Sequence, residues 1–324
     1  MNMIEVKNLI KEFTVVEKKE GIRGAIQNLI KSQKKVVRSV DDITFTIPKG
    51  EIVGFLGPNG AGKSTTIKML TGILHPTQGS VLVNNLSPHE NRQQVVKNIG
   101  VVFGQRTQLY WDLRLGETFE LLKRIYRLED KAYKQTLSHI YEVLQIHNFI
   151  NIPVRQLSLG QRMRGELAAA IIHSPSILFL DEPTIGLDIE AKLAIRQYII
   201  ELNQKQNTTV ILTSHDIDDV SALCKRLIVI NQGKIVEDGP LDSLINDLSP
   251  YRELVIELTE PSNLLAHPLA EITKVEGLKV YYKFNRKDVT AQQLISGLSH
   301  LPIRDFGIKE PDLEKLIKEV YKKK

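Results

Sequence analysis

The chain has 324 residues, of which 42% are hydrophobic and 25% charged, with a net charge of +5. This composition is typical of a soluble globular protein with one large or two smaller domains, and the basic balance weakly favours an anionic neighbour such as a membrane surface or nucleic acid. The lone Cys224 excludes an intramolecular disulfide and fits a reducing cytoplasm. Residues 1–13 lack the apolar core of a signal peptide. The sequence has no uninterrupted run of about 18 apolar residues, so we expect no membrane span.

The order of predicted elements indicates an α/β fold followed by a smaller appendage. Short β-branched strands alternate with longer helical patterns up to about residue 245, which predicts one α/β domain with a helical subdomain at about 105–172. Residues 246–324 change to a mixed pattern and predict a small α+β accessory domain. The clearest predicted strands are 51–56, 177–180, 209–213 and 227–230, and in the appendage RELVIEL and LKVYYKF, with helices at VTAQQLISGL and EPDLEKLIKEVYKKK.

An insertion at about residues 16–39 stands out inside the predicted α/β domain. Its apolar residues fall on one face of a predicted helix, and lysines and arginines surround them; the apolar residues are Ile22, Ile26, Leu29 and Ile30. This pattern suits a helix that lies on an anionic membrane surface or against a membrane partner. A solvated basic loop with a short helix is an equal alternative.

The phosphate-binding motif GPNGAGKS occupies residues 57–64, between an apolar strand and a predicted helix. In that setting, backbone N–H groups and the positive end of the helix dipole surround an anion. Lys63 would reach the β- and γ-phosphates, and the Ser64 hydroxyl would hold Mg²⁺. A chance glycine turn is the alternative, but strand and helix are both in register. The predicted phosphate-binding residues are Gly57, Pro58, Asn59, Gly60, Ala61, Gly62, Lys63, Ser64 and Thr65.

Two adjacent carboxylates, Asp181 and Glu182, end the apolar strand at residues 177–180. Acids there can simply emerge into solvent. Beside a phosphate loop, however, they have a specific use, because Asp181 would orient Mg²⁺ or its water. Glu182 would polarise the water that attacks the γ-phosphate. We therefore predict that Glu182 is the catalytic base.

Three further polar segments follow predicted strands or begin a helix. Gln105 follows an apolar strand and can reach Mg²⁺ or water through its amide oxygen. Ser158 begins a long helix in the segment LSLGQ, which makes a second helix start that attracts anions. His215 ends another strand and can bond a phosphate or the attacking water, although a surface histidine is the simpler interpretation.

The ordered set GPNGAGKS, Gln105, LSLGQ, ILFLDEP, GLD and TSH resembles the ATP-binding subunits of ABC transporters, over about residues 4–239. The resemblance implies a P-loop NTPase cassette and assigns further roles. Phe13 would stack on adenine, although it could also be an ordinary core residue at a strand end. The resemblance also implies that Gln105 links Mg²⁺ to the membrane partner and that His215 acts as a switch at the γ-phosphate. Ser158, Gly160 and Gln161 would contact the ATP held by the opposite subunit. Asp188 would lie at the dimer seam.

One departure from the family pattern is Leu159, because the signature is usually LSGGQ. A glycine in the third place lets the loop backbone approach phosphate. A leucine is tolerable there only if its side chain points away from ATP. We expect a working site.

The resemblance implies an ATPase that pairs with a second copy, or a like cassette, around two ATP molecules. It would drive a separate permease at the cytoplasmic face of the cell membrane, and the cassette with its tail resembles exporter-type bacterial subunits. A soluble cassette ATPase acting on ribosomes or DNA is less consistent, because the chain has one cassette and no long coiled coil. A GTP switch lacks its N-K-x-D motif. The tail shows no catalytic cluster, since His267 and His300 lack metal-ligand spacing, and a regulatory, dimer-stabilising or passive role stays open.

Overall fold

The structure, a computed structural model, describes residues 1–17, 33–104, 107–214, 217–248, 250–263, 265–309 and 317. Gln105, His215, the helix predicted within the insertion and nearly all of the last predicted helix lie outside the described residues. The chain forms two compact units, residues 1–238 and 239–324. The domain boundary expected after residue 245 falls inside helix α9 (Leu241–Leu248). The two compact units of the structure instead divide between residues 238 and 239.

The core of the first unit is a six-stranded sheet in the order β5-β6-β7-β3-β8-β9. Its strands are β3 (Ile52–Leu56), β5 (Ile99–Phe103), β6 (Ile177–Asp181), β7 (Thr209–Thr213), β8 (Arg226–Asn231) and β9 (Lys234–Pro240). Strands β5, β6, β7, β3 and β8 pair in parallel. Because such a sheet is covered on both faces, its strands are nearly continuous apolar runs, which is why the four predicted strands are confirmed. Their carboxyl ends meet at one edge, where the polar residues that follow β3, β6 and β7 gather.

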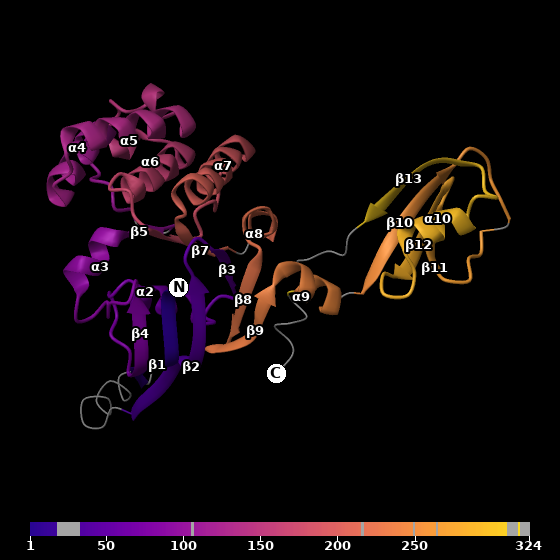
Figure 1. Cartoon of the computed structure of the whole chain (residues 1–324), viewed down its shortest axis with the longest axis horizontal. Helices are drawn as coiled ribbons and strands as arrows, with labels where there is room; N and C mark the ends of the chain where they lie inside the picture. The colour runs from indigo at the N-terminus through magenta and orange to yellow at the C-terminus, as the bar shows by residue number, and fades with distance from the viewer. Residues whose placement is uncertain are drawn as a thin grey trace, which may run out of the picture. The chain divides into compact units, whose positions relative to one another are not determined.

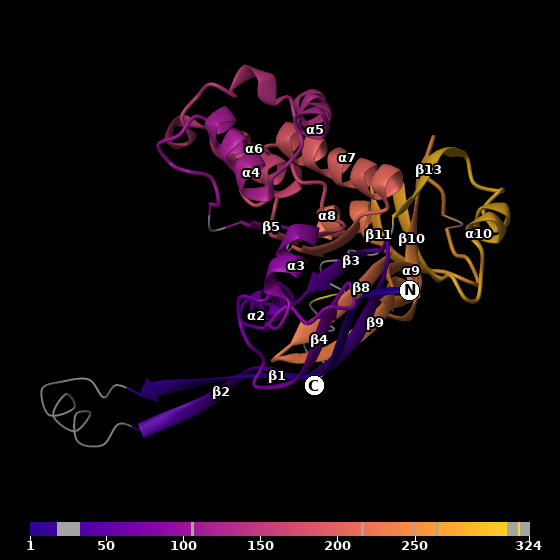
Figure 2. The ribbon, with the colours of Figure 1, turned by 60° about the vertical axis from the view of Figure 1, so that its left-hand side comes forward.

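A second, antiparallel sheet has the order β2-β1-β4, with β1 (Asn2–Glu17), β2 (Gln33–Pro48) and β4 (Gln78–Val83). Strand β4 pairs with β1 only as far as Ile10, so the ends of β1 and β2 continue as a two-stranded ribbon (Figures 1 and 2). The described ends of the insertion are therefore strands and not helix flanks. The β-branched Val36 and Val37 pair there with Thr14 and Phe13.

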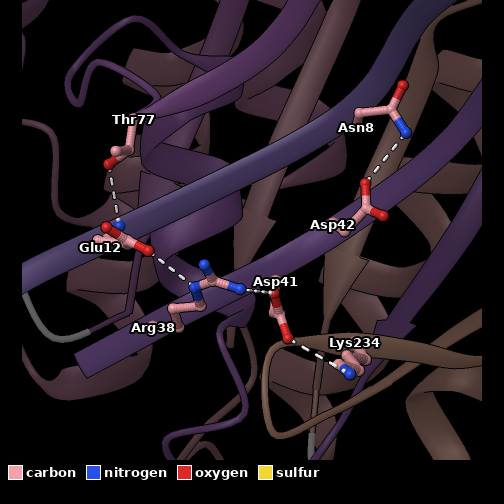
Figure 3. Close-up of polar contacts among 7 residues, drawn as sticks. All are labelled: Asn8, Glu12, Arg38, Asp41, Asp42, Thr77 and Lys234. Atoms are coloured by element: carbon pink, nitrogen blue, oxygen red, sulfur yellow. Dashed lines mark hydrogen bonds and ion pairs between the residues drawn. The ribbon is translucent and has the colours of Figure 1, made fainter. Parts of the chain in front are cut away.

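Polar contacts hold the base of this ribbon against the rest of the unit (Figure 3). The Arg38 guanidinium bonds Glu12 at 2.7 Å and Asp41 at 3.0 Å, and Lys234 lies 3.4 Å from the other oxygen of Asp41. The backbone N–H of Asp41 also donates to the Gly233 carbonyl at 2.8 Å. These contacts fix the strand that passes beside the phosphate loop.

Helices complete the first unit: α2 (Lys63–Leu70), α3 (Arg92–Asn98), α4 (Leu115–Tyr126), α5 (Asp130–Val143), α6 (Leu159–Ile171), α7 (Ile189–Gln206) and α8 (Ile217–Leu223). Helices α4, α5 and α6 lie together beyond the β5 edge of the sheet (Figure 1). The helices predicted within residues 112–152 are confirmed as α4 and α5, and single 3₁₀ turns at Ile146–Asn148 and Val154–Gln156 lead to α6.

The second unit has a four-stranded antiparallel sheet in the order β11-β12-β10-β13 and the helix α10 (Ala291–Gly297). Its strands are β10 (Tyr251–Leu258), β11 (Glu271–Glu276), β12 (Lys279–Asn285) and β13 (Ile303–Lys309). Alternate residues of β10 and β12 pack against Leu294 and Leu298, which confirms the predicted strands and the first predicted helix of the tail. None of the helices in the described part of the chain is long and apolar enough to cross a bilayer.

Candidate functional site

The phosphate loop lies between β3 and α2, and its glycines are required by close backbone packing. Gly60 and Gly62 have φ angles of +81° and +109°, in the left-handed region. A Cβ at Gly62 would lie 2.4 Å from the Ser39 carbonyl oxygen, and one at Gly57 would lie 2.2 Å from that of Ile230. Only glycine fits these places, so the loop can curl with its N–H groups at the start of α2.

Lys63 is buried beneath this loop, with 8% of its surface exposed. Its ammonium donates to the carbonyl oxygens of Gly57 at 2.5 Å and Pro58 at 3.1 Å. Burial lowers the pKa of Lys63 below its ordinary value, while the nearby carboxylates of Glu182 and Asp181 act in the opposite direction. The Lys63 ammonium is thus held by carbonyl oxygens of its own loop, within electrostatic reach of the two acids.

Asp181 ends β6 directly opposite the start of α2. One carboxylate oxygen accepts the Ser64 hydroxyl at 3.1 Å, and the other accepts the Thr213 hydroxyl at 2.5 Å. A hydroxyl and a carboxylate in contact are the oxygen ligands that Mg²⁺ prefers. Ser64 and Asp181 therefore fit the predicted metal role.

Glu182 has a φ of +53°, which is uncommon for a residue with a side chain. Its N–H donates to the Thr213 carbonyl at 3.0 Å and lies 3.2 Å from the Thr213 hydroxyl oxygen. Such a conformation costs on the order of 1–3 kcal/mol and persists where surrounding contacts fix it, often at functional sites. Thr213 therefore supports both acids, a role that the sequence interpretation did not assign. The sequence shows that this threonine ends an apolar strand, but only the structure shows that this strand pairs with β6.

These groups surround one cavity of about 340 Å³, a volume within the range of small-molecule sites. It brings the phosphate loop together with both acids, as predicted. Ser39, which was not predicted, also lines it, and its hydroxyl lies 2.9 Å from that of Thr65. The lining residues are Ser39, Asn59, Gly60, Ala61, Gly62, Lys63, Ser64, Thr65, Lys68, Phe103, Gly104, Asp181 and Glu182.

Phe13 lies on β1 opposite Val37, near but not among the residues that line the cavity. Its side chain is 38% exposed, with the Lys11 ammonium 5.2 Å from the ring centroid. The alternative interpretation as an ordinary core residue is therefore wrong. The exposed Phe13 ring lies beside the strand that carries Ser39, where it can stack on a nucleotide base.

The LSLGQ segment forms the start of α6, apart from this cavity. Ser158 caps the helix: its hydroxyl accepts from the Gln161 N–H at 3.2 Å, and the Gln161 side chain accepts from the Ser158 N–H at 2.9 Å. Asp188 caps α7 with a single bond, because its carboxylate accepts from the Ala191 N–H at 2.7 Å, and it lies beside Gly160. Ser158, Gly160 and Gln161 are not among the described residues that line the cavity. Within one chain, the structure does not bring them to the phosphate loop.

Comparisons with known proteins agree on one family. The sequence family described as ABC transporter matches residues 40–185. The ABC transporter ATP-binding protein NatA of Bacillus subtilis is 37% identical over 212 residues, which cover 65% of this chain and 86% of that protein. The linearmycin resistance ATP-binding protein LnrL of the same species is 29% identical over 86% of this chain and 91% of its own.

Solved structures show the same fold. The solved structure of an ATP-binding subunit of an ABC transporter is 24% identical, with a TM-score of 0.64 over 76% of this chain and 92% of its own. The ATP-binding cassette MJ0796, a dimer bound to ADP and Pi, is 27% identical with a TM-score of 0.62, over 74% of this chain and 99% of its own. The chain therefore belongs to the ABC transporter family, as an ATP-binding cassette subunit with ATPase activity.

Proposed function

We propose that two copies of this chain, or one copy and a like cassette, clamp two ATP molecules and that hydrolysis drives a separate membrane permease working as an exporter. Relatives named for linearmycin resistance and multidrug transport support the outward direction. Relatives named for methionine import match at 29–30% identity, so direction is part of the proposal. We place the subunit at the cytoplasmic face of the membrane, held there by its permease, and expect no nucleic-acid partner.

The mechanism uses the residues around the cavity. The loop N–H groups and Lys63 would bind the phosphates, and Ser64 with Asp181 would hold Mg²⁺, which supplies charge neutralisation when bound. Glu182 would take the proton of the attacking water. Thr213 holds the Asp181 carboxylate and the Glu182 backbone, so the Asp181 carboxylate is oriented before the reaction begins. Gln105 and His215, outside the described residues, keep the metal and γ-phosphate roles that the family resemblance implies.

The observation that carries the dimer is the separation of the α6 start from the chain's own cavity. The start of α6 is capped and does not reach the phosphate site of its own chain. It can therefore contact the phosphate of an ATP molecule bound by a second copy. Apolar side chains beside it support a buried seam, since Ile189 is 78% exposed, Leu193 56% and Leu159 39%. Ile189 and Leu193 lie one turn apart on α7. Such exposed aliphatic groups mark an interaction surface.

The permease would dock beside the segment that follows Gln105. Tyr110 and Trp111 are about half exposed there, and aromatic residues are enriched at interfaces. A cavity of about 180 Å³ nearby is lined by residues of α3, β5, α4 and α6, together with Gln108. The basic insertion would add contact with anionic lipid at the same membrane.

The direct test is to measure ATPase rate per molecule over a dilution series, together with crosslinking through α7. We expect the specific rate to fall on dilution and crosslinked dimers to form with ATP. A specific rate that stays constant far below any plausible dissociation constant, with no nucleotide-dependent dimer, would contradict the paired mechanism. The direction of transport is tested separately. The chain is reconstituted in vesicles with its co-purified permease, and the side of the membrane on which the transported substrate accumulates is measured.

A further inference from the structure

Glu166, on the inner side of α6, is a buried carboxylate that the proposed reaction does not use. Only 3% of its surface is exposed. Burying an ionised carboxylate is costly unless hydrogen bonds compensate. Burial raises the pKa of Glu166, and bonds from Thr107, Gln108 and Leu109 act to lower it. All of these opposing bonds come from one short segment, which follows Gln105 directly in the chain.

The contacts join this segment to α6 at several atoms. The Thr107 hydroxyl donates to one Glu166 carboxylate oxygen, and the Gln108 N–H lies 3.2 Å from both oxygens. The Gln108 side-chain amide donates to the Glu166 backbone carbonyl at 3.0 Å. The Arg155 N–H then donates to the Trp111 carbonyl at 3.0 Å. Residues 107–111 are therefore fastened both to α6 and to the 3₁₀ turn just before it.

Gly104, on the other side of Gln105, is fastened to the central sheet instead. Its N–H donates to the Asp181 carbonyl at 2.8 Å, and a Cβ there would lie 2.7 Å from the Glu182 carbonyl oxygen. The chain is thus attached to the sheet at Gly104 and to α6 from Thr107 onward. Among the described contacts, the bonds of Thr107 and Gln108 to Glu166 are the first that join the segment after Gln105 to α6.

We propose that Glu166 is a positioning residue that makes residues 107–109 and α6 one rigid body, so that a displacement at Gln105 moves the start of α6. This inference rests on the proposed function, in which Gln105 senses the nucleotide and the α6 start contacts the ATP of the second copy. Without the carboxylate, residues 107–109 would keep only the bond from the Gln108 side-chain amide to the α6 backbone, and α6 would move less when Gln105 responds to ATP.

The test measures the distance between two spin labels, one on α5 at Lys131→Cys and one on β4 at Gln78→Cys. The parent protein also carries Cys224→Ser, which removes the native cysteine, and Glu182→Gln, which slows hydrolysis. Both labelled positions are exposed. We expect MgATP to change this distance in the parent, and Glu166→Ala to reduce the change to less than half while ATP binding stays within about threefold. Glu166→Gln, which keeps one acceptor oxygen, should retain an intermediate change. Glu142→Ala, which removes an exposed carboxylate of α5, is the matched control and should behave as the parent.

The outcomes separate the two proposals. A parent that binds no ATP contradicts the proposed function. A parent that binds ATP without a distance change, or a Glu166→Ala variant with the full change, overturns the role of Glu166. If Glu166→Ala does not fold, Thr107→Val removes one bond of the same attachment. In that variant, an undiminished distance change would also overturn the inference.

Discussion

The Leu159 side chain lies against Gly186: a Cβ built on Gly186 would be 2.9 Å from Leu159 Cδ2. Gly186 has a φ of +69° and belongs to the GLD segment that follows Asp181 and Glu182. The leucine that departs from the usual signature thus occupies space above a glycine of its own chain. This contact explains how α6 can begin with a bulky residue beside Gly160.

The first prediction is that Leu159 and Gly186 are energetically coupled. Leu159→Gly should retain or raise ATPase activity, because the leucine is not needed for phosphate contact. Gly186→Ala should cost about 1–3 kcal/mol of unfolding free energy, from the left-handed backbone and the contact with Leu159. In the Leu159→Gly background that cost should fall by roughly 0.5–1 kcal/mol. Urea unfolding of the four proteins measures this, and strictly additive costs would show that the two residues do not interact.

The second prediction concerns Glu182. Glu182→Gln should lower turnover by about a hundredfold or more, because the amide cannot accept the proton of water. ATP binding and unfolding free energy should change little, since Thr213 holds the backbone of residue 182 rather than its side chain. Glu190→Gln, which changes an exposed glutamate in the first turn of α7, is the control. Steady-state ATPase rates and equilibrium nucleotide binding give the answer, and a variant that keeps more than a tenth of the parental rate would exclude Glu182 as the base.

The parts of the fold that could be predicted are those with a strong local signal. The strand before Asp181 is a continuous apolar run, and the loop before Lys63 has a glycine pattern that few other structures need. Strand β11 was missed because its sequence EITKVE is mostly exposed and polar. The support of Asp181 by Thr213 and the attachment of Thr107 to Glu166 join residues far apart in the chain. The periodicity of hydrophobic residues in one sequence reveals local structure only. It cannot reveal contacts between distant residues, because these form only when the chain packs into its tertiary structure.

The third prediction is the pH dependence of Lys63. Burial lowers its pKa, so its ammonium should lose its proton at lower pH than an exposed lysine. The Glu182 carboxylate raises this pKa, and Glu182→Gln should therefore move the deprotonation to still lower pH. Rates of acylation at Lys63 against pH, followed by mass spectrometry with exposed Lys131 as the internal reference, measure both effects. An upward shift in Glu182→Gln would contradict the electrostatic contact between the two residues.

The fourth prediction is acid sensitivity at the junction of α4, α6 and β5. His173 stacks on Tyr126, with ring centroids 4.0 Å apart and planes 5° from parallel, and its Nε2 lies 3.0 Å from the Ile99 carbonyl oxygen. Burial lowers the pKa of His173 to about 4. An unfolded histidine, with a pKa of about 6.5, binds its proton first as the pH falls. The neutral ring therefore stabilises the fold less and less from pH 6.5 down to about 4.

Between pH 7 and pH 5 this histidine alone should remove about 2 kcal/mol of unfolding free energy. His173→Phe keeps an aromatic ring against Tyr126 but cannot titrate. Its absolute stability should fall because Ile99 loses its partner, yet its loss between the two pH values should be smaller than that of the parent by about 2 kcal/mol. Urea unfolding at both pH values, with the exposed His147→Gln as control, measures the difference. Equal losses in the parent and in His173→Phe would mean that His173 binds its proton at the same pH in the folded as in the unfolded protein.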